Sequence, residues 1–147
     1  MIEFLFSRLA IITCGMLILG ISLSAFNVID EKAEESRLEK SLEEIKSCIK
    51  TVALYPEVEQ IIEMRSVLFD PECALIIKKD YIKITLRQIQ IVSRLHQDIK
   101  LYGDGENYGS RNLTEVEWIE FRCEDIMHLR NEITDNGTVV IVQIEKR

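Results

Sequence analysis

The chain has 147 residues, which is room for one membrane anchor and one small domain. It carries 18 Lys and Arg against 25 Asp and Glu, a net charge of −7, and its sequence contains no basic stripe. This balance argues against nucleic acid as a partner and against polybasic attachment to anionic lipid. Two Pro and six Gly are too few for a disordered or low-complexity chain.

An uncharged, apolar stretch from Leu9 to Ile29 opens the chain. Its 21 residues would span about 31 Å as a helix, close to the thickness of a bilayer's hydrocarbon core. We therefore predict an N-terminal tail and transmembrane helix over residues 1–29. Within it, Gly20 and Ser24 form a small-xxx-small pair, which lets helices pack closely in lipid. The alternative is a signal peptide cut at Ala25, although apolar residues continue beyond that position.

The positive charges that flank the span give two interpretations of its orientation. Arg8 lies before the span, and three basic residues lie between positions 32 and 40, among several acids. A strict count of Lys and Arg favours a cytoplasmic C-terminus. A very short N-terminal tail, however, is typical of signal anchors that export the following domain. We expect a single-pass protein of the cell membrane whose C-terminal domain is extracytoplasmic.

The apolar span passes into an amphipathic segment without a helix breaker. Residues 30–52 contain neither Pro nor Gly, and Pro56 ends the run. One stripe of apolar residues follows helical spacing and should pack on a folded domain, at Leu38, Leu42, Ile45 and Ile49. We predict that an amphipathic helix over 30–55 continues the span. A span, a short break and a separate helix form the alternative.

After Pro56 the hydrophobic spacing changes from a period of 3.6 to a period of 2, which is typical of strands. Strands are predicted at Cys73–Lys78 and Tyr81–Leu86, joined by a hairpin near Asp80, and residues 89–95 alternate next.

Asp135-Asn136-Gly137 is the strongest turn signal in the chain. Asn-Gly supplies the positive φ angles of a type I′ hairpin, and residues 140–144 alternate as a strand after it. Glu115–Cys123 is predicted as one strand, Glu57–Phe69 fits either period, and Gly103–Arg111 is predicted as a long solvated loop. Residues 56–147 therefore form a β-rich domain. The predicted class is α+β, a long N-terminal helix packed on a small antiparallel sheet.

No motif for catalysis, cofactors or metals emerges from the polar residues. The glycines of loop 103–109 lack the spacing of a phosphate-binding fingerprint. Cys123 and His128 lie five residues apart with no second pair at metal spacing. No Ser or Cys sits in a nucleophile motif, and the acids are scattered. We therefore expect no enzyme, no cofactor and no metal.

Four cysteines and two glycosylation sequons bear on the compartment of the domain. If the domain is exported, one disulfide can form, and Cys73 with Cys123 is the pairing we favour; reduced buried thiols are the alternative. The sequons at Asn112 and Asn136 fall in predicted loops and agree with export.

This layout resembles the type IV pilins, and most closely the small pilin-like and secretion-associated proteins of archaea. The resemblance covers most of the chain through its layout: an uncharged N-terminal helix, an amphipathic continuation and a small antiparallel sheet. It implies that the helix stripe holds a β-rich head and that exported sequons carry glycans. The chain departs from the family at Ser7-Arg8-Leu9, which provides no prepilin peptidase site, and at Thr13, where pilins often carry an acid. The resemblance therefore implies an accessory subunit.

Two functions follow as hypotheses. The first is a structural, single-pass component of a membrane-associated, filament or secretion assembly, with the lipid bilayer and other pilin-like or membrane subunits as partners. The second is a membrane-tethered extracytoplasmic module that binds or senses a ligand.

Overall fold

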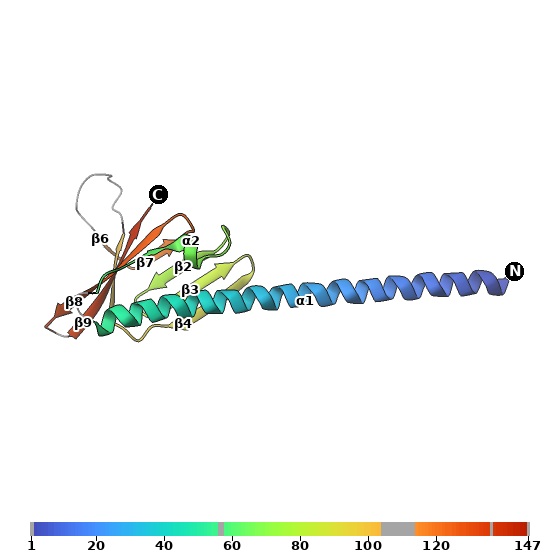
Figure 1. Ribbon diagram of the computed structural model, residues 1–147, viewed down its shortest axis with the longest axis horizontal. Coiled ribbons are helices and arrows are strands. Elements are labelled where there is room, and N and C mark those ends of the chain that lie inside the picture. The colour runs from blue at the N-terminus through green and yellow to red at the C-terminus, as the bar shows by residue number, and fades with distance from the viewer. Residues whose placement is uncertain (1, 56–57, 104–113, 136, 147) are drawn as a thin grey trace. The chain divides into compact units, whose positions relative to one another are not determined.

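The computed structural model describes residues 2–55, 58–103, 114–135 and 137–146 (Figure 1). Within these residues one long helix, one short helix and nine strands are present. The predicted α+β class, with a long N-terminal helix and a mostly antiparallel β structure, is confirmed. The chain divides into two compact units, Met1–Ser36 and Arg37–Arg147.

Helix α1 runs from Ile2 to Leu54 without interruption, so the span and the amphipathic segment belong to one helix. Its last turn contains no basic residue, and its final carbonyls need other donors. Asn131 supplies one, because its side-chain amide donates to the carbonyl oxygens of Val52 at 2.8 Å and Ala53 at 3.4 Å. The end of α1 is therefore tied to the β domain by a polar contact.

The strands of the second unit form two sheets rather than one. The five-stranded sheet has the order β1-β8-β9-β5-β6 and comprises β1 (Gln60–Glu63), β8 (Ile126–Thr134), β9 (Gly137–Glu145), β5 (Ile99–Gly103) and β6 (Thr114–Val116). The four-stranded sheet has the order β4-β3-β2-β7 and comprises β4 (Ile89–Arg94), β3 (Tyr81–Leu86), β2 (Ala74–Lys78) and β7 (Trp118–Phe121). All strand pairs are antiparallel except β5 with β9, which is parallel.

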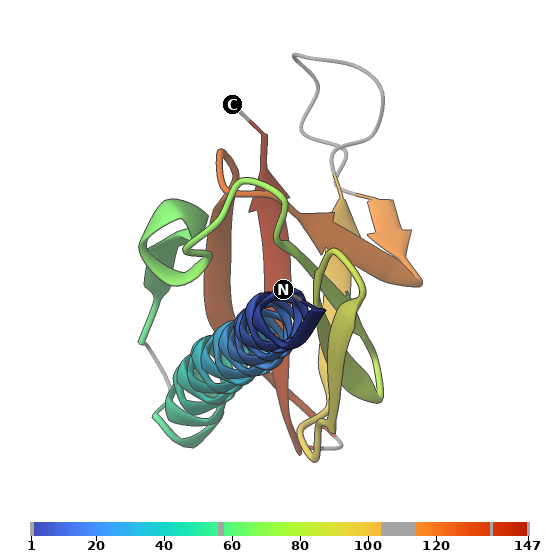
Figure 2. The same ribbon diagram turned by 90° about the vertical axis from the view of Figure 1, so that its right-hand side faces the viewer.

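The core of the second unit lies between the inner faces of both sheets and the Arg37–Leu54 part of α1. Figure 2 views the chain along α1, from the N-terminal end of the helix. The helix contributes a continuous buried stripe, made up of Leu38, Leu42, Ile45, Ile49 and Val52. Each of these side chains is at most 2% exposed. Near Leu38, the buried hydroxyl of Ser41 donates a hydrogen bond of 2.7 Å to the carbonyl of Val67. This bond joins α1 to the start of the loop that follows residues 64–67.

The predicted β2–β3 hairpin is confirmed, with Ile77 opposite Ile82 and strict alternation of buried residues along β3. The predicted β8–β9 hairpin is confirmed as well. Its turn differs from the prediction, because Gly137 pairs with Thr134 as the first residue of β9 and is not a central turn residue. Gly137 has φ +129°, a backbone conformation that favours glycine. Asn136 lies outside the described residues.

The prediction of a single strand over Glu115–Cys123 is wrong. The segment bends at Glu117 and forms β6 and β7, which belong to different sheets. The ambiguous segment Glu57–Phe69 contains β1 followed by the four-residue helix α2 (Met64–Val67). Of the predicted loop Gly103–Arg111, Gly103 ends β5, and the other residues lie outside the described part of the chain.

Because the helix stripe belongs to the same core as both sheets, truncating it should destabilise the whole domain. We expect Ile45→Ala to lower the free energy of unfolding by about 2–5 kcal/mol. The measurement is urea unfolding of the full chain in detergent micelles, followed by the fluorescence of Trp118, the single tryptophan. The exposed Lys50→Ala should change this free energy by less than about 0.5 kcal/mol. Equal effects of the two substitutions would show that the stripe does not stabilise the domain.

Candidate functional site

The first candidate site is the apolar part of α1. Its large apolar side chains between Ile11 and Ile29 are 52–69% exposed. By length and composition, this helix can cross a membrane, a property that a signal sequence near an N-terminus shares. A Cβ atom added at Gly20 would have no atom within 4 Å, and Ser24 is exposed. Within the described residues, no other part of the chain therefore covers the helix surface at Gly20 and Ser24.

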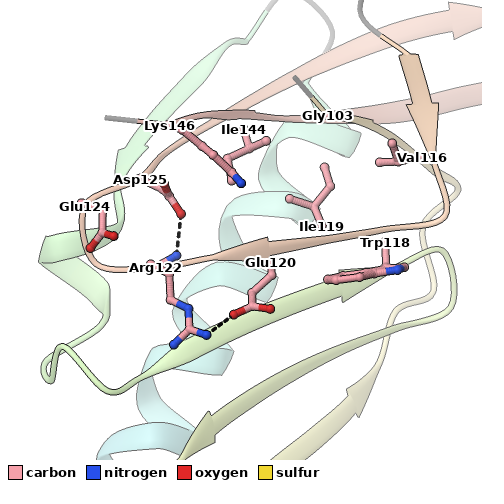
Figure 3. Close-up of a pocket in the computed structure, with 10 residues that line it drawn as sticks. All are labelled: Gly103, Val116, Trp118, Ile119, Glu120, Arg122, Glu124, Asp125, Ile144 and Lys146. Carbon is pink, nitrogen blue, oxygen red and sulfur yellow. Dashed lines mark hydrogen bonds and ion pairs between the residues drawn. The ribbon is translucent and has the colours of Figure 1, made fainter. Parts of the chain in front are cut away.

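A cleft in the second unit is the second candidate site (Figure 3). Its volume is about 430 Å³, and it lies between β7, an edge strand of the four-stranded sheet, and strands of the other sheet. The floor is apolar, with Val116, Ile119 and Ile144 among the lining residues. Gly103 also lines the cleft, and a Cβ atom added there would lie 3.3 Å from a methyl group of Val116.

Charged residues are also part of the lining, at Glu120, Arg122, Glu124, Asp125 and Lys146. Figure 3 shows Lys146 on the same side of β7 as Ile119, whereas Trp118, Glu120 and Arg122 project to the other side. Arg122 forms an ion pair with Glu120. Such a lining can hold a ligand through apolar contact and charge. Within the described residues, no group of three or more His, Cys, Asp or Glu side chains could hold a metal ion.

Asp125 organises the turn at the end of the cleft. It is 5% exposed, and its carboxylate accepts a hydrogen bond of 2.6 Å from the backbone N–H of Arg122. Its own backbone N–H donates to the carbonyl of Arg122 at 3.1 Å, and its carbonyl accepts from Met64 at 3.1 Å. The buried carboxylate therefore stabilises the turn that connects β7 to β8.

Cys73 and Cys123, the predicted disulfide pair, both reach the loop that follows α2. The Cys123 thiol donates to the carbonyl oxygens of Asp70 at 3.0 Å and Leu68 at 3.4 Å. The backbone N–H of Cys73 donates to the same oxygen of Asp70 at 3.0 Å. The thiol of Cys123 and the backbone N–H of Cys73 thus share one acceptor, the carbonyl oxygen of Asp70. A disulfide between the two cysteines stays a prediction.

Burial raises the pKa of the Cys123 thiol, and Glu124 and Asp70 raise it further, against smaller opposing effects of Arg122 and Arg65. Burial and the charge of Glu44 likewise raise the pKa of Cys48. Both thiols are thereby kept in the protonated, less nucleophilic form.

The remaining predicted residues fall into two groups. Asn112 and Asn136, the sequon asparagines, lie outside the described residues. Leu38, Leu42, Ile45 and Ile49 lie in the core, as described above. Sequence patterns missed the cleft, since its lining comes from β5, β6, β7, β9 and the turn before β8, which are brought together only by sheet pairing.

No protein-family model matches this chain, and no curated protein or solved structure matches it either.

The raised pKa of Cys123 gives a pH prediction for the reduced chain. We expect its alkylation by iodoacetamide to reach half-maximal rate at a higher pH than in the urea-unfolded chain, where the thiol pKa is about 8.5. By linkage, this thiol's contribution to stability is complete below the unfolded pKa and is lost as the pH rises through the folded one. Peptide mapping by mass spectrometry measures the rate at Cys123, and an equal or lower midpoint in the folded chain would contradict the prediction.

The role of Asp125 predicts a difference between two substitutions. Asp125→Ala leaves the N–H of Arg122 without its acceptor and should lower the free energy of unfolding by about 1–3 kcal/mol. Asp125→Asn keeps an acceptor oxygen and should cost less. Urea unfolding of the full chain measures both, with the exposed Glu124→Ala as control. An equal loss in the two variants would mean that the charge of Asp125, and not its acceptor oxygen, matters here.

Proposed function

We propose that this chain is a single-pass membrane protein that serves as a structural, pilin-like accessory subunit of a membrane-associated or filament assembly. One observation carries the proposal: a single helix that is apolar and exposed over Ile11–Ile29 also supplies the buried stripe of the β domain. A simple tether has no need to enter the core of the domain that it anchors. In this chain the anchor and part of the core belong to the same helix.

The open surface at Gly20 and Ser24 supports an assembly partner within the membrane. Small residues four apart let a second helix approach closely, and packing in lipid depends on such approach. The C-terminal domain, in this proposal, is extracytoplasmic and presented at the cell surface.

A second function, a membrane-tethered binding module, is favoured by the cleft beside β7. Its volume of about 430 Å³ lies in the range of small-molecule sites. Its apolar floor and the charged residues of its lining suit an amphiphilic ligand.

The test of the structural proposal is the assembly state of the full chain in its membrane. After extraction in gentle detergent, we expect native mass spectrometry to find the chain in complexes with copies of itself or with other single-pass subunits. Gly20→Leu should reduce this association about tenfold, because a bulky side chain separates the helices.

Gly15→Leu is the matched control. Gly15 is also a glycine of the span with open space around it, but it faces a different side of the helix. Its substitution should leave the association unchanged. A wild-type chain that is monomeric and without partners in mild detergent would refute the structural proposal, and ligand binding by that monomer would favour the binding module.

A further inference from the structure

The outer face of the four-stranded sheet gathers cations and aromatic rings. Register places Trp118 opposite Lys78 and Tyr81 opposite Arg94, with Lys83 two residues along β3 on the same face. These five residues, named here the cationic face, alternate with buried residues such as Ile77, Ile82 and Ile119. Trp118 is 50% exposed.

The positive charges of this face are not neutralised by acids of the described chain. Lys78 lies over the ring of Tyr81, with 5.5 Å between its ammonium nitrogen and the ring centroid. Among described residues, no ion pair involves Lys78, Lys83 or Arg94. The neighbouring acids have other partners: Glu120 pairs with Arg122, and Glu115 with Lys79 at 3.0 Å. Asp80, on the β2–β3 turn, is exposed.

A complementary feature lies on helix α1. Acidic residues recur at every fourth position and are all exposed, at Glu31, Glu35, Glu39 and Glu43. Residues four apart are neighbours on a helix, and like charges there repel. Only Glu43 of this acidic ladder has an ion-pair partner among the described residues, Lys46 at 2.7 Å. Cations from outside the helix would relieve the repulsion along the ladder.

We propose that the acidic ladder of one copy of this chain docks on the cationic face of a second copy. Glu31 to Glu39 span about 12 Å along the helix axis. Lys78 and Arg94 lie two strands apart, about 10 Å. The two surfaces thus present three opposite charges each over a similar length. The flat sides of Trp118 and Tyr81 contact the carbon stems of the helix side chains. This contact rests on the proposed role as an assembly subunit and names its interacting surfaces.

The test uses two charge-reversal variants of the full chain in detergent micelles. The face variant is Lys83→Glu with Arg94→Glu, and the ladder variant is Glu35→Lys with Glu39→Lys. Each alone places like charges against each other and should weaken self-association about tenfold or more, as measured by sedimentation equilibrium. Mixed together, the two variants should associate with a dissociation constant within about threefold of the wild type, because every contact between unlike copies then joins opposite charges.

The control variant reverses two exposed cations away from the cationic face, Arg65→Glu with Arg130→Glu. Since it changes the net charge by as much as the face variant, it should leave self-association nearly unchanged. Circular dichroism of all variants should match the wild type. Added salt should weaken association of the wild type, because exposed ion pairs are screened.

Several results would overturn the docking. Unchanged association in the face and ladder variants would exclude it, while leaving assembly through the span intact. If both variants associate weakly and their mixture does not recover, the cationic face binds a partner other than the acidic ladder. Binding to phosphatidylglycerol vesicles that the face variant loses, with self-association retained, would identify that occupant as anionic lipid. A monomeric wild type would instead remove the proposed assembly function itself.

Discussion

The burial of one helix stripe is the constraint on which the rest of this structure depends. Leu38, Leu42, Ile45 and Ile49 are buried in the same core as residues of both sheets. Burial of their apolar surface favours folding in proportion to the area that is removed from water. The stripe also explains why two small sheets, each with an apolar inner face, form one core: both pack against the same helix. Removal of the helix would expose all three surfaces together.

Polar contacts then fix the positions of the elements relative to one another, because apolar burial is not directional. Ser41 fixes the loop after α2 to the helix, Asn131 closes the end of α1, and Asp125 holds the turn between β7 and β8. Each of these contacts joins a side chain to a backbone group that would otherwise be costly to bury. They give the domain a defined arrangement, and with it the cleft beside β7 and the charged outer face of the four-stranded sheet.

The charges of this protein are distributed unevenly, and net charge alone hides this. The chain has a net charge of −7, yet it carries both an acidic helix surface and a sheet face with three cations. Among the described residues, these three cations form no ion pair. Opposite charges on separate surfaces of the same molecule favour contact between copies and oppose other arrangements of the same surfaces. An apolar span and a charged contact outside the membrane would therefore specify an assembly at two levels. In the proposed assembly, the first would supply proximity in the bilayer, and the second would select the orientation.

Local patterns of the sequence by themselves determined the long helix, its buried stripe and the two hairpins. In each case the signal is local: helical spacing without Pro or Gly over residues 30–52, and alternation around a tight turn in β2–β3. Only the tertiary structure decided that Glu115–Cys123 divides between two sheets, that β5 pairs in parallel with β9, and that Trp118 lies beside Lys78. These features depend on pairing between distant segments. Strand register follows from the way that whole faces are buried, which no local window contains.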